Sequence, residues 1–296
     1  MTPTSTDPLA LVNHPSTDAL LRLALEEDLG QGDVTTAIMV PANIEGHAQI
    51  LTREDVVVAG LPLLSRVRDL MGANFHVEEA VEDGQRVLAG GVLARLEGPA
   101  GEILSAERLL LNLLQRLTGI ATMTRRCVEL MGNEKARLLE TRKTLPGWRR
   151  LDKYAVLMGG GTNHRLGLHD QILAKENHFA LAGSTAEDFA QAVVSLLDAR
   201  PEGMLVEVEV ESLEQLTTIL TLEPTVDIVL LDNMTIDELR RAVSLRDARG
   251  AKPLLEASGG IGPKTLRDVA ATGVDRISMG ALTHSVRAPD LTLLFD

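Results

Sequence analysis

Residues 204–233 read MLVEVEVESLEQLTTILTLEPTVDIVLLDN, and this stretch decides the fold. Two short apolar runs, 204–212 and 227–233, end in acidic residues, and a segment with helical periodicity separates them. Four further runs share the pattern: ARLLETRK (136–143), QILAKEN (171–177), PLLEASGG (253–260) and DRISMGAL (275–282). Strand-like runs that alternate with helical segments predict βα units and a parallel sheet, which is an α/β fold.

The chain before residue 136 has a different texture. Residues 44–104 contain short β-like runs broken by glycine, and these predict an antiparallel sheet with accessory helices. After Ser105, leucines recur at three- and four-residue spacing and predict a long helix that ends near Gly132. Ser16 or Thr17 is expected to cap an earlier helix that ends before Gly30.

These patterns suggest four segments. We expect a loose arm over residues 1–15, which are rich in Thr, Pro and Ser, and an N-terminal domain with the long helix over 16–132. An α/β domain is expected over 133–282. The last residues, 283–296, are expected to pack back on the N-terminal domain.

The composition limits the classes of function. Of the 296 residues, 45% are apolar and 24% are charged, the balance of a soluble globular protein. The net charge of -13 and an aromatic content of 2% argue against a nucleic-acid partner, which needs a broad basic surface or stacking platforms. Cys127 is the only cysteine, so no intrachain disulfide can form. With no secretory signal and no run of eighteen apolar residues, we expect a cytoplasmic protein without a membrane partner.

Cations gather where the predicted strands end, although the chain is acidic. Arg142 and Lys143 follow an apolar pair, and Lys175 follows another apolar run. Charged residues commonly lie on the solvated surface, but those that directly follow a buried apolar strand are expected to be partly buried. In an α/β barrel the carboxyl ends of the strands meet on one face, where the chemistry is placed. We therefore expect these cations to converge in one mouth.

Carboxylates also lie at the ends of these runs. Glu207, Glu209 and Glu211 share one face of a strand, and Asp232 ends the next run. The face could be solvated, but both faces of a parallel sheet are covered, and an unpaired buried carboxylate is costly. At least one of these glutamates should then meet a cation or Mg²⁺. Asp232 has an equally good alternative as a helix cap.

The last two runs are candidates for binding phosphate. Ser258, Gly259 and Gly260 precede a helix whose first turn is expected to hold Pro263, and Gly280 repeats the arrangement one unit later. Glycines let a backbone approach an anion, and helix N-termini offer free N–H groups. Each glycine set alone could simply make a tight turn. Both sets at the end of a βα series favour phosphate.

His164 and Arg165 follow a triple glycine, in the stretch GGGTNHRLGLHDQILAKENH (159–178). A lone histidine is more often a structural residue, and no HExxH zinc spacing is present. The GxGxxG and GxSxG patterns of dinucleotide-binding proteins and serine hydrolases are also missing. Several cations, a few carboxylates and two glycine loops instead indicate a site for a polyanionic substrate with Mg²⁺.

An ordered series of motifs resembles the quinolinate phosphoribosyltransferase family. The matching pieces are EEDLGQGDVTT, AERLLLNLLQRLTGIAT, ETRKTLPGWRRLDKYAV, GGGTNHRLGLHDQILAKENH, VEVE, LLDN, LEASGGI and GVDRISMGALTHS. They cover nearly the whole chain from about residue 20. The resemblance implies an N-terminal α/β sandwich and an incomplete α/β barrel. It also implies a homodimer in which Arg116 completes the neighbouring site.

The implied reaction transfers the phosphoribosyl group of phosphoribosyl pyrophosphate to the ring nitrogen of quinolinate. Pyrophosphate and CO₂ leave, and nicotinate mononucleotide forms, a step of de novo NAD biosynthesis. By the same resemblance, four groups of residues have roles. Quinolinate would be bound by Arg116, Arg142, His164 and Arg165; Lys143 and Lys175 would lie close to either ligand; Glu209 and Asp232 would face the ribose and Mg²⁺; and Ser258, Gly259, Gly260 and Gly280 would hold the 5′-phosphate. The lysines and the two acids form the implied catalytic set.

The chain departs from the family pattern at two positions, Glu140 for Asp and Leu145 for Thr, which puts fine geometry in question. Three other functions remain open. A paralogous phosphoribosyltransferase could act on another acidic aromatic, a noncatalytic protein could bind a phosphate ligand, and a barrel isomerase or decarboxylase could act on a sugar phosphate. The last would not explain two arginines and two lysines in one mouth.

Overall fold

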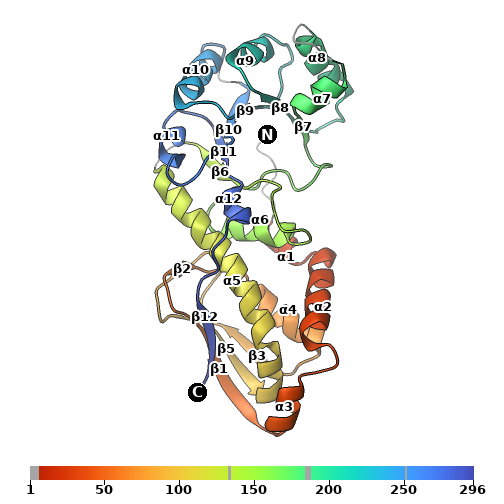
Figure 1. Cartoon of the computed structure of the whole chain (residues 1–296), viewed down its shortest axis with the longest axis vertical. Coiled ribbons are helices and arrows are strands. Elements are labelled where there is room, and N and C mark those ends of the chain that lie inside the picture. Colours follow the sequence, from red (N-terminus) through yellow and green to blue (C-terminus); the bar gives the residue numbers. More distant parts are fainter. Residues whose placement is uncertain (1–6, 133–134, 184–187, 251) are drawn as a thin grey trace. The chain divides into compact units, whose positions relative to one another are not determined.

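The computed structural model describes residues 7–132, 135–183, 188–250 and 252–296 (Figure 1). It divides the chain into two compact units. The first comprises Met1–Arg126, Lys143–Gly161 and Leu282–Asp296, and the second comprises Cys127–Arg142 and Thr162–Ala281. These boundaries differ from the expected ones, because residues 143–161 join the first unit although they lie between two strands of the second.

The first unit contains a four-stranded sheet in the order β12-β1-β5-β3, and every neighbouring pair is antiparallel. Its strands are β1 (Glu45–Thr52), β3 (His76–Glu79), β5 (Val92–Pro99) and β12 (Leu291–Phe295). The short strands β2 (Val56–Val57) and β4 (Arg86–Val87) pair separately. Side chains of β1 alternate between buried and more exposed positions, so one face of the sheet packs on the core.

The helices of the first unit are α1 (Pro8–Val12), α2 (Pro15–Leu29), α3 (Val34–Met39), α4 (Pro62–Met71), α5 (Ala100–Met131, which continues into the second unit) and α6 (Arg149–Met158). Of these, α2 and α5 begin earlier than the sequence patterns predicted. The expected loose arm is wrong over residues 8–12, because α1 buries Leu11 and Val12 there. Residues 1–6 of that arm lie outside the described residues.

The predicted cap of α2 and the predicted start of α5 are also corrected. Pro15 occupies the first position of α2, where its missing N–H costs nothing. His14 is therefore the cap rather than Ser16 or Thr17, and its Nδ1 accepts the amide of Ser16. Ser105 lies inside α5, where its hydroxyl donates to the carbonyl of Gly101 four residues back.

The second unit contains a six-stranded parallel sheet in the order β6-β11-β10-β9-β8-β7. The six predicted runs supply its strands, in order β6 (Arg137–Leu139), β7 (Ile172–Ala174), β8 (Val206–Val210), β9 (Ile228–Asp232), β10 (Leu254–Ser258) and β11 (Arg276–Ser278). The sheet curves but stays open, because β6 and β7 are its two edges. This is the incomplete barrel that the resemblance implied.

Helices connect the parallel strands and lie outside the curved sheet (Figure 1). They are α7 (Glu176–Leu181), α8 (Phe189–Ala199), α9 (Leu213–Ile219), α10 (Ile236–Asp247) and α11 (Leu266–Ala270), while α12 (Ala281–His284) follows β11 at the boundary between the units. Every residue of β8 is buried, as a parallel sheet covered on both faces requires. Among the helices that the structure describes, none is both long and apolar enough to cross a membrane.

Candidate functional site

The carboxyl ends of the six parallel strands carry the polar side chains of the second unit. Because neighbouring strands run in the same direction, these ends lie along one edge of the sheet. The side chains at or just after the strand ends are Glu140, Lys175, Glu209, Asp232, Ser258 and Ser278. Apolar strands therefore bring polar side chains from six separate parts of the sequence to one edge, and four of the six are charged.

Two arginines lie close together at this edge. Arg142 follows β6, Arg165 lies in the loop between Thr162 and Gln171, and both are half-buried. Burial lowers the pKa of Arg165, and the positive charge of Arg142 lowers it further. Arg165 also donates from Nη1 to the carbonyl of Gln171 at 3.0 Å. Two neighbouring guanidinium groups repel each other and favour an anion that contacts both.

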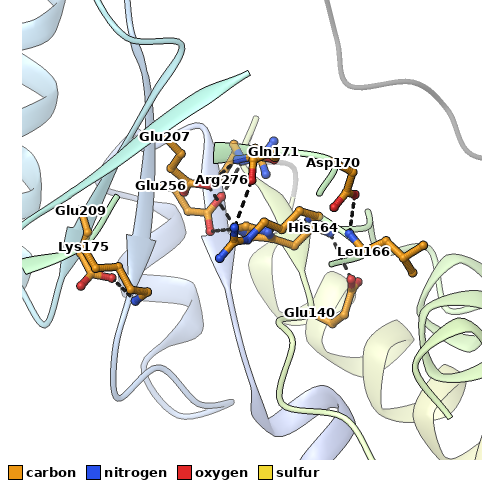
Figure 2. A network of polar contacts seen from close by, with 11 residues as sticks. Glu140, His164, Leu166, Asp170, Gln171, Lys175, Glu207, Glu209, Glu256 and Arg276 are labelled. Atoms are coloured by element: carbon orange, nitrogen blue, oxygen red, sulfur yellow. Dashed lines mark hydrogen bonds and ion pairs between the residues drawn. The ribbon is translucent and has the colours of Figure 1, made fainter. Parts of the chain in front are cut away.

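A second cluster combines a cation with two carboxylates. Lys175 forms an ion pair with Glu209, so a glutamate of β8 meets a cation as predicted (Figure 2). Burial raises the pKa of Glu209 to about 7, Glu176 adds to the rise, Lys175 opposes it, and the charge of Asp232 raises it again. Asp232 itself accepts a hydrogen bond from the side chain of Asn233 at 2.6 Å.

The glycines in the loop after β10 let neighbouring groups come close to the backbone. Gly259 has φ +90, and a Cβ there would lie 2.2 Å from Oδ1 of Asn233. Gly260 has φ +61, and a Cβ there would meet nothing within 4 Å. Only glycine adopts such angles without strain. One glycine therefore packs against the loop after β9, and the other faces open space.

The helix after this loop begins later than predicted. It starts at Leu266 rather than near Pro263, because Gly262 and Thr265 first close a turn through a 3.0 Å hydrogen bond. At the neighbouring strand end, the Ser278 hydroxyl oxygen is buried and has no hydrogen-bond partner among the described residues. Gly280 lies directly before α12.

His164 lies in a buried polar network that the sequence analysis did not foresee (Figure 2). Its Nε2 is 3.3 Å from a carboxylate oxygen of Glu207 and 3.3 Å from one of Glu256. Arg276 donates from Nε to Glu256 at 2.6 Å, and Gln171 donates from Nε2 to Glu207 at 2.6 Å. These four partners come from β8, β10, β11 and the loop before β7, and the side chains of Glu207 and Glu256 are fully buried.

Both ring nitrogens of His164 are engaged by the protein. Burial alone would lower the pKa of His164, but the carboxylates of Glu256 and Glu207 outweigh burial and raise it. The backbone amide of Arg165 donates a hydrogen bond to Nδ1 at 2.7 Å. This bond uses the lone pair of Nδ1, so it disfavours a ring that is protonated on both nitrogens. Both contacts fix one orientation, with Nε2 toward the carboxylates and Nδ1 toward the amide.

The two carboxylates of this network differ in acidity. Burial acts to raise the pKa of Glu256, but His164 and Arg276 lower it to about 2. Burial raises the pKa of Glu207, and the charge of Glu256 raises it further. Glu256 is therefore the more acidic of the two, and its ionised carboxylate pairs with His164 and Arg276.

Glu140, one of the departures from the family pattern, anchors the same loop. Its buried carboxylate accepts the backbone amide of His164 and the side-chain amide of Asn163, both at 3.1 Å. A signal for part of the network was present in the sequence, since Glu256 and Arg276 are opposite charges inside apolar strand runs. Their pairing depends on strand register, which places Glu256 opposite Arg276.

Two of the predicted site residues, Arg116 and Lys143, belong to the first unit. Arg116 lies on α5 and donates from Nε and Nη2 to the buried carboxylate of Asp152, at 3.0 and 2.7 Å. Its guanidinium carbon also lies 5.6 Å from the ring centre of Trp148. Lys143 is exposed, and its carbonyl accepts a hydrogen bond from Thr283.

The second unit thus has the architecture of an α/β-barrel enzyme, with charged side chains and glycine loops at the carboxyl ends of parallel strands. Comparisons with known proteins identify the family. The model of the quinolinate phosphoribosyl transferase N-terminal domain matches residues 33–118, and that of the C-terminal domain matches residues 120–294. The chain belongs to the quinolinate phosphoribosyl transferase family.

Similar proteins cover nearly the whole chain. A nicotinate-nucleotide pyrophosphorylase (carboxylating) of Mycobacterium leprae is 44% identical over 92% of this chain and 95% of its own length. A probable enzyme of the same name from Bacillus subtilis is 39% identical over 95% of this chain and 94% of its own. The solved structure of the nicotinate-nucleotide pyrophosphorylase from Francisella tularensis superposes with a TM-score of 0.88 at 37% identity, covering 97% of this chain and 99% of the other.

Proposed function

We propose that this protein is an enzyme that transfers the phosphoribosyl group of phosphoribosyl pyrophosphate to the ring nitrogen of quinolinate. Pyrophosphate and CO₂ are released, and nicotinate mononucleotide is the product. The family match over both domains supports this reaction, as do the names of the similar proteins. The observation that carries the proposal is the pair of half-buried arginines at the same edge of the sheet as two carboxylates and a glycine loop.

Arg142 and Arg165 are proposed to bind quinolinate. The substrate has two adjacent carboxylates on a pyridine ring, and two neighbouring guanidinium groups match that pair of charges. Each charge-assisted hydrogen bond contributes about 1.5 to 3 kcal/mol. Lys175 would neutralise further negative charge at the same edge. Quinolinate would also relieve the repulsion between the arginines.

Glu209 and Asp232 are proposed to hold Mg²⁺. The fit rests on their chemistry, because carboxylate oxygens are the ligands that Mg²⁺ takes, and on their proximity, because the charge of Asp232 raises the pKa of Glu209. When bound, the ion supplies positive charge that offsets the departing pyrophosphate. Ser258, Gly259, Gly260 and Gly280 are proposed to hold the 5′-phosphate, and the open space beside Gly260 suits that role.

The chemistry needs no protein nucleophile. The ring nitrogen forms a bond to the anomeric carbon of the ribose as the bond to pyrophosphate breaks. Carboxylates near the ribose stabilise the positive charge that grows on the sugar during this step. The glycosylated nitrogen then carries a positive charge next to the carbon that loses CO₂. That charge stabilises the electron pair left behind until a proton replaces the carboxylate.

A homodimer is part of this proposal. Arg116 would reach the site of a second copy and contact quinolinate there. Its bonds to Asp152 and its packing on Trp148 support such a role, because they fix the guanidinium before the ligand arrives. Arg116 uses Nε and Nη2 in these bonds, and a guanidinium has five N–H donors in a fixed plane. Lys143, exposed in the first unit, would serve either ligand.

The test is a direct assay of the purified protein. Phosphoribosyl pyrophosphate and Mg²⁺ are supplied with either quinolinate or nicotinate, and pyrophosphate and CO₂ are followed. Quinolinate should give both products in equal amounts. Turnover of nicotinate without turnover of quinolinate would refute the proposed substrate, and binding of both ligands without turnover would point to a noncatalytic protein.

Two variants divide the site between the substrates. Arg142→Ala should raise the KM for quinolinate roughly 10- to 100-fold, the equivalent of one lost charge-assisted contact at about 1.4 kcal/mol per decade. Asp232→Ala should mainly raise the KM for phosphoribosyl pyrophosphate and the Mg²⁺ requirement. Small and equal effects of both changes on both substrates would contradict the assignment.

A further inference from the structure

The buried network around His164 is larger than a structural histidine needs. Arg165 donates its amide to His164, His164 faces Glu207, Gln171 donates to Glu207, and the carbonyl of Gln171 accepts from the Arg165 guanidinium. These contacts form a closed loop of interactions that begins and ends at Arg165. Both ends of Arg165, its backbone amide and its guanidinium, are therefore held by the same network.

A second set of contacts fixes His164 from the other strands. Glu256 approaches Nε2 at 3.3 Å, and the buried Arg276 donates to the fully buried Glu256 at 2.6 Å. Glu140 binds the His164 backbone amide from the end of β6. The imidazole of His164 thus has partners on β8 and β10, its backbone amide has one on the segment after β6, and Arg276 on β11 acts on the imidazole through Glu256. Buried polar contacts of this kind favour one geometry and resist rearrangement.

We propose that Glu256, Arg276 and Gln171 are positioning residues for substrate capture, which act by fixing His164 and so aiming Arg165 at the anionic pyridine substrate. In this view His164 acts through Arg165, because both of its ring nitrogens have protein partners. The inference rests on the proposed function for the identity of the substrate. The arrangement of the network rests on the contacts alone.

A buried metal is the alternative use of these side chains. His164, Glu207 and Glu256 offer ligand atoms within 4.8 Å of one another. Oε1 of Glu207 and Oε1 of Glu256 have no hydrogen-bond partner among the described residues. The other oxygen of Glu207 accepts from Gln171 and that of Glu256 accepts from Arg276, which favours positioning. Arg276 also brings a positive charge to the place where a cation would bind.

The test compares two variants that each remove a carboxylate from a buried arginine. Glu256→Gln removes the charge beside His164 and Arg276. Asp275→Asn is the matched control, because Asp275 directly precedes Arg276 at the start of β11 but pairs with the buried Arg246 at 2.5 Å and accepts the amide of Leu255, instead of bonding to His164 or its partners. Both variants should lower the melting temperature. Only Glu256→Gln should alter quinolinate binding and the loop that carries His164 and Arg165.

We expect Glu256→Gln to raise the KM for quinolinate about tenfold and to leave the KM for phosphoribosyl pyrophosphate within twofold. Hydrogen exchange of peptides that cover residues 162–171 should become faster in Glu256→Gln and stay unchanged in Asp275→Asn. An unchanged quinolinate KM, or an equal rise in the control, would overturn the proposal. One equivalent of tightly bound metal in the wild type that is lost in Glu256→Gln would also overturn it.

Gln171→Met covers the case in which Glu256→Gln does not fold. This change removes the donor to Glu207 but keeps the backbone carbonyl that holds Arg165, so a rise of about threefold in the quinolinate KM is expected, with faster exchange in the same peptides. No change in either measurement would refute the positioning role. The exchange measurement needs no substrate, so a wild type that does not turn over quinolinate would refute the proposed function while the network is still tested.

Discussion

Gly259 and Gly260 offer a sharp test of the loop after β10, because a single methyl group should have different effects at adjacent positions. Both residues adopt positive φ angles, +90 and +61. An alanine at either position would incur about 1 to 2 kcal/mol of backbone strain. At Gly259 the new Cβ would also lie 2.2 Å from Oδ1 and 2.9 Å from the backbone nitrogen of Asn233, whereas at Gly260 it would meet nothing within 4 Å.

The expected free-energy difference follows from these distances. Overpacking of a tight site typically costs about 1 to 3 kcal/mol. Gly259→Ala should therefore lower the free energy of unfolding by roughly 2 to 5 kcal/mol, and Gly260→Ala by only about 1 to 2. Urea unfolding followed by far-UV circular dichroism measures both. Equal stability of the two variants within about 0.5 kcal/mol, the usual uncertainty of such comparisons, would refute this expectation.

The two alanines should also separate stability from binding. Asn233 donates to the carboxylate of Asp232, so displacement of Asn233 in Gly259→Ala should disturb the proposed Mg²⁺ ligand as well as the fold. In Gly260→Ala the methyl group would enter the space proposed for the 5′-phosphate. The KM for phosphoribosyl pyrophosphate should thus rise in both variants, although only Gly259→Ala loses much stability.

Three further predictions concern titratable groups. Burial raises the pKa of the Cys127 thiol to about 11, so little reactive thiolate is present at pH 8. Mass spectrometry should show that iodoacetamide at pH 8 leaves Cys127 unlabelled in the native protein and labels it fully in urea. Rapid labelling of the native protein would contradict a buried thiol. The pKa of Glu256 is lowered from its ordinary value of 4.5 to about 2, so the stabilisation from its ionised form is present above pH 4.5 and is lost as the pH falls toward 2. The urea midpoint of the wild type should therefore fall more steeply with acid than that of Glu256→Gln, and parallel curves would argue against an ionised Glu256. Since the pKa of Glu209 is raised to about 7, its carboxyl group is largely protonated at pH 6, and Mg²⁺ should bind more weakly there than at pH 8. Calorimetry with the Mg²⁺ complex of phosphoribosyl pyrophosphate measures this affinity. An affinity that does not change between pH 6 and pH 8 would exclude Glu209 as a ligand.

The positions of several site residues followed from local patterns. Lys175 and Asp232 could be placed at strand ends because an apolar run of β-like residues ends just before or at each of them. A parallel sheet then brings such ends to one edge whatever the details of packing. The same logic predicted a cation for a glutamate of β8, because an unpaired buried carboxylate is too costly. These inferences needed only strand periodicity and the cost of burial.

Local patterns were weaker at helix ends and at the chain terminus. Serine and threonine are common caps, yet Pro15 made His14 the cap of α2, and Ser105 bonded within α5 instead of starting it. Residues 8–12 looked like an unstructured arm because threonine, proline and serine dominate the N-terminal segment. Leu11 and Val12 nevertheless found a buried surface, which only the folded chain provides.

The sequence by itself determined the alternation of strands and helices, the position of each parallel strand and the placement of charged residues at strand ends. These features depend on neighbours within a few residues. The tertiary structure alone decided which charges meet. Arg276 reaches Glu256 across 20 positions and Asn163 reaches Glu140 across 23, through strand pairing and loop closure. A buried ion is tolerated only beside its partner, and the choice of partner depends on register and packing across the whole sheet.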